Sequence, residues 1–149
     1  MKKPFLNDFE NWKKLNNDFS LFDYLFQITK KKEFNSDIIF AFLDLFWPSF
    51  VVYNEYVFLK NNFSAEKVKN LINEKQNVEY WVNLLVVDPY FENEENSEEE
   101  SEFFAKSLVQ IWQTKLKNDF PLKKIVVEYV FDSECGDYGL TFHQINKMK

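Results

Sequence analysis

The residues that could do chemistry in this chain are few and lie near its C-terminal end. His143 is the only histidine and Cys135 the only cysteine. A thiol beside an imidazole can act as a nucleophile once the imidazole takes its proton. Suppose that Phe131 pairs with Gly139 in a final hairpin. His143 then lies opposite Val127, while Cys135 sits near the loop tip. At about 3.4 Å per strand residue the two are more than about 10 Å apart. The sequence therefore predicts no Cys–His dyad and places His143 as a half-exposed strand residue.

Three carboxylates surround a glycine in the loop Asp132-Ser133-Glu134-Cys135-Gly136-Asp137. Hard cations such as Ca²⁺ need several oxygen ligands at close spacing. This loop lacks the regular ligand alternation and the distal bidentate glutamate of a calcium loop, so the pattern favours a solvated turn. The only other glycine, Gly139, opens no helix, and a glycine-rich phosphate loop is absent. No catalytic residue, metal ligand or cofactor is assigned.

The strongest chemical signal is the acidic segment Glu92–Glu102, which holds seven glutamates and no lysine. The remaining 17 acidic residues face 18 lysines, so the net charge of −6 comes from this one segment. It could bind a metal, mimic a nucleic-acid backbone or dock on a basic protein. It could also be a solvated loop followed by a helix start, where negative charge is stabilising. If it docks on a basic partner, the contact residues are Glu94, Glu95, Glu98, Glu99 and Glu100.

Composition limits the function classes. Lysine supplies all 18 basic residues, so the chain has no arginine for bidentate contacts to guanine and phosphate. With a body close to neutral, nucleic-acid binding is not expected. The 18 phenylalanines predict a well-formed core. We expect no signal peptide and no membrane span, because no apolar run approaches the roughly 20 residues required. A reducing cytoplasm is the expected location.

Apolar spacing predicts helices that must position these residues. The expected helices are two short ones within Asn7–Thr29, Asp37–Trp47, Ser64 to about Lys75, Val78–Leu85 and about Glu98–Lys117. Ser20, Ser64 and Asn77 are expected to cap three of them. The helix from Asp37 is apolar nearly all round, so we expect it to be the central buried helix. A buried strand over part of it is the alternative, because a short apolar run fits both structures. In the helix from Val78, we expect Val78, Trp81, Val82 and Leu85 to share one side.

Two hairpins are predicted from β-branched and aromatic runs. The first pairs Ser49–Asn54 with Glu55–Lys60, and the second pairs Lys124–Phe131 with Gly139–Ile145. The order of helices, hairpin, helices and hairpin indicates an α+β fold with a mainly antiparallel sheet of about four strands packed against the helices. The chain of 149 residues predicts a single domain spanning 1–149.

Three stretches resemble features of small uncharacterised bacterial proteins. They are Phe46-Trp47-Pro48-Ser49-Phe50 with Tyr56-Val57-Phe58-Leu59, then Trp112 to Pro121, then Asp137-Tyr138-Gly139-Leu140-Thr141-Phe142. The resemblance implies a bacterial origin and assigns no role to any residue.

The leading hypothesis is a small protein-binding module without catalysis, such as an immunity-type neutraliser of a basic partner. Its size and charge resemble those of bacterial immunity proteins. One alternative is a small-molecule-binding protein or a carboxylate-based enzyme. The other is a self-associating structural protein, and the oligomeric state is left open.

Overall fold

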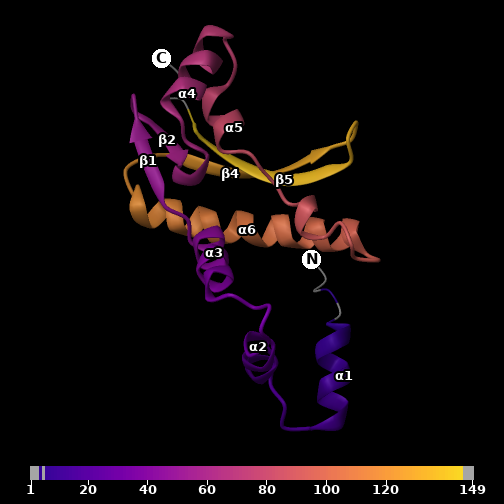
Figure 1. Ribbon diagram of the computed structural model, residues 1–149. Coiled ribbons are helices and arrows are strands. Elements are labelled where there is room, and N and C mark those ends of the chain that lie inside the picture. Colours follow the sequence, from indigo (N-terminus) through magenta and orange to yellow (C-terminus); the bar gives the residue numbers. More distant parts are fainter. Residues whose placement is uncertain (1–3, 5, 146–149) are drawn as a thin grey trace. The chain divides into compact units, whose positions relative to one another are not determined.

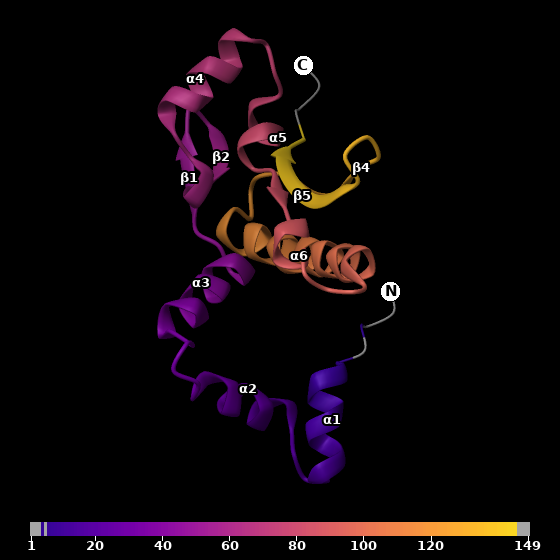
Figure 2. The same ribbon diagram turned by 45° about the vertical axis from the view of Figure 1, so that its right-hand side comes forward.

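The computed structural model describes residues 4 and 6–145 (Figures 1 and 2). Internal contacts divide the chain into two compact units, Met1–Leu45 and Phe46–Lys149. The α+β prediction is confirmed, because the described residues form helices and two antiparallel sheets. Of the helices described, none has the length and apolarity needed to cross a membrane. The expectation of a single domain stays a prediction.

The first unit is helical. Its helices are α1 (Asn7–Leu15), α2 (Leu21–Thr29) and α3 (Ser36–Phe46), the last of which runs one residue past the unit boundary. Ser20 caps α2 as predicted, in a reciprocal capping box with Asp23. Aromatic rings join α1 to α2, because Phe9 and Trp12 both stand edge-on to Tyr24. This small cluster is the core of the unit, and Phe9 is its only buried side chain among the described residues.

The prediction that α3 is the central buried helix is wrong. None of its described residues is buried, and Phe40 leaves 66% of its surface exposed. The apolar composition that suggested burial is nevertheless present along the whole helix. The core of the fold forms elsewhere, in the second unit.

The bond between α1 and α2 makes a testable prediction about pH. The Tyr24 hydroxyl donates to the Asp8 carboxylate, and this hydrogen bond is the main cause that raises the pKa of Tyr24 from 10.0 to about 12. Because the folded state holds this proton more tightly, its contribution to stability is complete below pH 10 and is lost as the pH rises toward 12. A difference titration of phenolate absorbance between the protein and Tyr24→Phe should give a midpoint near pH 12.

Asp8→Asn is the control for that titration, because it removes the charged acceptor and keeps the helix. In that background the Tyr24 midpoint should fall toward 10.0. A midpoint near 10.0 in the unmodified protein would contradict the Asp8 bond.

The second unit holds both sheets. Its elements are β1 (Phe50–Tyr53), β2 (Tyr56–Leu59), η1 (Lys60–Asn62), α4 (Ala65–Asn73), α5 (Val78–Val82), β3 (Leu85–Val86), η2 (Asp88–Tyr90), α6 (Ser97–Asp119), β4 (Ile125–Asp132) and β5 (Asp137–Gln144). Both predicted hairpins are confirmed, and Asn54 and Glu55 turn the first with positive φ angles. The hairpins do not share one sheet: β1 and β2 form a pair, and the other sheet has the order β3-β5-β4.

The segment after α4 differs from the prediction. The helix that begins at Val78 ends at Val82 rather than Leu85, and Trp81 is exposed instead of facing inward with its neighbours. Leu85 and Val86 form β3, which pairs with β5 at Leu140 and Gly139. The two strands approach so closely that a Cβ at Gly139 would collide with the Leu85 carbonyl. Glycine is therefore required at that position.

The long helix α6 lies along one face of the β4–β5 hairpin (Figures 1 and 2). Its buried residues recur at helical spacing and are Ser101, Ala105, Leu108, Trp112 and Leu116. Trp112 stands edge-on to Phe142 of β5 with ring centres 6.2 Å apart. Gln113 fixes the helix to the edge of β4, since its amide donates to the Ile125 carbonyl and its oxygen accepts from Val127 N.

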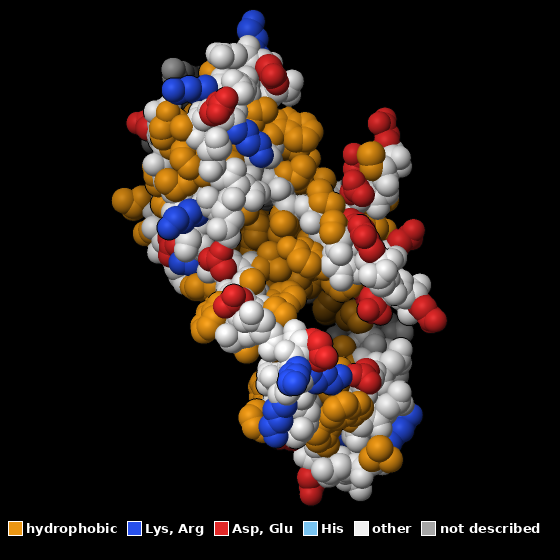
Figure 3. Space-filling view, viewed as in Figure 1, with side chains coloured by type: hydrophobic (Ala, Val, Ile, Leu, Met, Phe, Trp, Pro, Cys, Tyr) orange, Lys and Arg blue, Asp and Glu red, His pale blue; other side chains and the backbone are white. Residues whose placement is uncertain are grey.

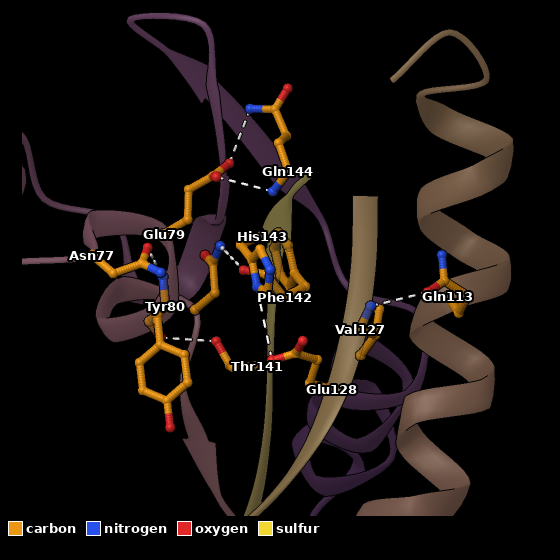
Figure 4. Close-up of polar contacts among 11 residues, drawn as sticks. Asn77, Glu79, Tyr80, Gln113, Val127, Glu128, Thr141, Phe142, His143 and Gln144 are labelled. Atoms are coloured by element: carbon orange, nitrogen blue, oxygen red, sulfur yellow. Dashed lines mark hydrogen bonds and ion pairs between the residues drawn. The ribbon is translucent and has the colours of Figure 1, made fainter. Parts of the chain in front are cut away.

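Side chains of α5 and its C-cap join the two sheets where no strand does. The short strand β3 pairs only with Gly139 and Leu140 of β5. Further along β5, the Asn83 side chain donates to the Phe142 carbonyl, and it also donates to the Val57 carbonyl of β2 and accepts from Leu59 N. One turn earlier, the Glu79 carboxylate accepts from Val57 N and from Gln144, as Figure 4 shows for Gln144. These two side chains replace a strand by satisfying the edges of β2 and β5.

Candidate functional site: an acidic and aromatic face

The two halves of the acidic segment differ in secondary structure. Glu92, Glu94 and Glu95 lie in the turn after η2, and Glu98–Glu100 form the first turn of α6. This confirms the helix start expected from the sequence, where carboxylates complement the helix dipole. Of the five residues proposed to contact a partner, Glu94, Glu95, Glu98 and Glu99 are exposed.

The fifth, Glu100, is placed differently. It is partly buried, and its Oε2 atom has no hydrogen-bond donor among the described residues. Burial raises the pKa of Glu100, and the charge of Glu94 raises it further. Glu100 is therefore less available to a partner than the other four carboxylates, although it lies in the same surface.

The free end of the β4–β5 hairpin lies beside this acidic start of α6. The Asp88 carboxylate in η2 accepts a hydrogen bond from Tyr138 N, and the Phe131 and Tyr138 rings contact each other at a tilt of 36°, with centres 4.8 Å apart. Burial raises the pKa of Tyr138, and the charges of Glu98, Glu102 and Asp88 add to the effect. Figure 3 shows acidic side chains gathered over both the hairpin end and the start of α6.

We name this surface the acidic–aromatic face. Its members come from three segments that are separate in the sequence, and they are Asp88, Glu94, Glu95, Glu98, Glu99, Glu100, Glu102, Tyr129, Phe131 and Tyr138. The contacts between η2, α6 and β5 hold the segments together. Of its members, those predicted from the sequence to contact a partner are Glu94, Glu95, Glu98, Glu99 and Glu100. The hairpin aromatics were missed as site residues, because only the strand register brings them to the same end as the glutamates.

A lysine within the protein already occupies one part of this face. Lys106 Nζ lies 2.6 Å from Glu102 Oε1 and 5.1 Å from the centre of the Tyr129 ring. Burial is the first cause that raises the pKa of Tyr129, followed by the charge of Glu102. The ring stays protonated and its face remains attractive to a cation. The arrangement of a carboxylate and a tyrosine ring around an ammonium group is therefore one that this surface can form.

The residues singled out for nucleophilic chemistry do not meet. Cys135 is exposed in the hairpin loop, and His143 lies six residues along β5 from Asp137, about 20 Å away at about 3.4 Å per residue. The predicted register is wrong by one residue, because Phe131 pairs with Tyr138 and His143 lies opposite Val126. A tighter loop causes the shift.

That loop has a structural explanation. Asp132 pairs with Asp137, and the Asp132 carboxylate accepts from the backbone N–H groups of Glu134 and Cys135. Gly136 completes the turn with a φ of 76°. The carboxylate that a cation would need is engaged with the backbone. In the described part of the chain, no three His, Cys, Asp or Glu side chains are grouped so as to hold a metal ion.

The sheet face turned toward α5 carries a histidine–carboxylate pair that sequence reasoning missed. His143 Nδ1 lies 4.0 Å from Glu128 Oε2, too far for a hydrogen bond (Figure 4). The neighbouring Thr141 hydroxyl is not available to His143, because it donates to the Tyr80 carbonyl. The buried carboxylate of Glu79 accepts hydrogen bonds from backbone and amide donors. The described structure therefore places no activated nucleophile beside His143 or Glu79.

Comparison of the chain with protein-family models, with curated proteins and with solved structures found no match.

Proposed function

We propose that this protein binds a basic partner protein through the acidic–aromatic face. The observation that carries the proposal is the Glu102–Lys106–Tyr129 arrangement, in which the surface holds an ammonium group between a carboxylate and a ring. The same face carries the exposed carboxylates of Glu94, Glu95, Glu98 and Glu99, in a segment that itself contains no lysine. A partner's lysines or arginines would find the same two kinds of contact.

The two kinds of residue divide the work of binding. Exposed carboxylates attract a basic surface from a distance and accelerate association, an effect that salt weakens. Phe131 and Tyr138 supply the apolar contact area, because aromatic residues are the usual anchors of interfaces. Phe131 leaves 50% of its surface exposed and is the best placed for this role. A non-catalytic neutraliser of a basic protein, of the immunity type, is the class of function that such a face serves.

The test uses an oligolysine peptide as the probe and fluorescence anisotropy as the measurement. The charge variant replaces Glu94, Glu95, Glu98, Glu99 and Glu100 with glutamine. At low salt we expect it to bind the probe at least about tenfold more weakly than the unmodified protein, and we expect the difference to shrink at high salt. Phe131→Ser should weaken binding at both salt concentrations, since an aromatic contact is not screened.

A matched control separates a local site from a general effect of charge. It replaces five acidic residues outside the face with glutamine: Glu10, Glu33, Glu55, Glu66 and Glu74. Both variants change the net charge from −6 to −1. The control should bind the probe nearly as well as the unmodified protein. Equal weakening by the two variants would show that only the overall charge matters, and the proposed face would then be abandoned.

A further inference from the structure

The helices α2 and α3 carry more apolar surface than the first unit can bury. On α2, Tyr24 faces α1, while Phe22 and Phe26 lie on the opposite side of the helix, and Leu25 is exposed beside them. Phe22 leaves 81% of its surface accessible. On α3 the exposure extends along the helix. The two helices have the composition of buried elements and the exposure of surface elements.

Physical chemistry makes this combination unstable in water without a cover. Helices of nine or eleven residues are too short to persist by themselves and depend on packing of their apolar sides. In the first unit the described core is one buried phenylalanine and its ring contacts. Another surface must therefore supply the packing that α2 and α3 lack.

The exposed area indicates the size of that surface. The large apolar side chains that are exposed on α2 and α3 include Phe22, Leu25, Phe26, Ile38, Ile39, Phe40 and Leu43. Their exposed fractions together equal about four complete side chains, or roughly 700 Å². Summed over the two helices, this area exceeds the about 300–600 Å² of the largest apolar patch on a typical monomer. It is close to the roughly 800 Å² that each partner buries in a standard interface.

We propose that a second copy of this chain covers this surface, so that α2 and α3 form the interface of a homodimer. The charges of the unit favour a copy of itself over other occupants. Met1–Leu45 holds seven lysines and seven acidic residues, so two copies do not repel each other there. The whole net charge of −6 belongs to the second unit.

The charged residues around the two helices are also self-complementary. Lys30, Lys31 and Lys32 follow α2, and Asp23 and Asp37 lie in the first turns of α2 and α3. In a two-fold interface each copy presents the same patch, so lysines of one copy can face acids of the other. Lys30 Nζ lies 4.2 Å from the centre of the Phe26 ring, at the boundary between the apolar and charged residues.

The same charges make a lipid surface the weaker choice. A helix that lies on anionic lipid carries an excess of lysine or arginine on its polar side. Between Leu21 and Trp47 three lysines face four acidic residues, so no such excess exists. A basic partner finds no acidic excess in the first unit either. The homodimer rests on residues separate from the acidic–aromatic face, and either proposal can fail without the other.

Sedimentation equilibrium of the full chain, from low micromolar to hundreds of micromolar, tests the proposal. We expect a reversible shift from 18.1 kDa to twice that mass. The double variant Phe22→Ser/Phe40→Ser should raise the dimer dissociation constant by at least about tenfold, since interface aromatics are frequent hot spots. The control is Leu15→Ser/Leu122→Ser, which removes two apolar side chains that are 91% and 97% exposed. The control should dimerise as the unmodified protein does.

A second measurement on the unmodified protein keeps the test valid if a variant fails to fold. Hydrogen exchange of α2 and α3 amides should slow as the protein concentration rises, while exchange in α6 should stay constant. A monomer at every concentration overturns the proposal, as does a dimer that the Phe22/Phe40 variant leaves intact. Monomers that bind neutral phosphatidylcholine vesicles through α2 and α3 would overturn it in favour of a membrane surface. Slow exchange at every dilution in a monomer would show that the chain covers these helices itself.

Discussion

Replacing Asn83 with alanine lowers the free energy of unfolding by about 3–5 kcal/mol, measured by urea denaturation. The Asn83 side chain is fully buried and makes hydrogen bonds to Leu59 N, the Val57 carbonyl and the Phe142 carbonyl. Alanine leaves three buried backbone groups without partners, and each costs about 1–3 kcal/mol when it is deprived of both water and protein. The loss is large because these bonds connect the two sheets.

Asn83→Asp tests whether the amide N–H groups of Asn83 are required. The aspartate keeps an oxygen for Leu59 N but directs a carboxylate at the carbonyl oxygens of Val57 and Phe142. We expect it to destabilise the protein at least as strongly as alanine does. Asn73→Ala, at an exposed position at the end of α4, is the control and should change stability by no more than about 0.5 kcal/mol. A loss at Asn83 no greater than at Asn73 would contradict the bridging role.

The second large effect is expected at Trp112. It is the largest of the fully buried side chains and fills the space between α6 and β5, against the Phe142 ring. Trp112→Ala should lower the free energy of unfolding by about 3–5 kcal/mol, because it removes apolar contacts and leaves a cavity. Against a total stability of about 5–15 kcal/mol for a small domain, this loss would leave much of the protein marginally folded.

Trp81→Ala is the matched control for Trp112. Trp81 also contacts an aromatic neighbour, Tyr80, but it lies on the exposed side of α5. Its removal should cost less, about 1–2 kcal/mol, because 47% of its surface is already exposed and no closed cavity is left. Circular dichroism during urea titration measures both variants. Equal losses at the two tryptophans would show that the core is not centred on α6 and β5.

Local signals in the sequence predicted most elements of the fold. Ser20, Ser64 and Asn77 cap the helices that they were expected to cap, because each side chain accepts a hydrogen bond from the backbone N–H three residues further on. The turn at Asn54-Glu55 is equally local, since asparagine tolerates the positive φ that a two-residue hairpin loop requires. Such interactions span a few residues and can be recognised in sequence.

The errors arose where distant residues compete. The strand β3 occupies positions read as the end of a helix, because pairing with β5 outweighs the helical preference of Leu85 and its neighbours. The register of the last hairpin shifted by one residue when the Asp132 carboxylate closed a tighter loop. Apolar α3 was expected at the centre, yet its burial depends on a covering surface that composition does not identify.

The candidate site divides in the same way. The sequence by itself determined where the negative charge lies and that glutamates begin a long helix, since both follow from the order of residues along one segment. Only the tertiary structure decided that Tyr129, Phe131 and Tyr138 lie beside those glutamates. It also decided that Asn83 and Glu79, rather than a strand, connect the two sheets. Both outcomes depend on strand register and on contacts between residues far apart in the chain, whose energies no local pattern records.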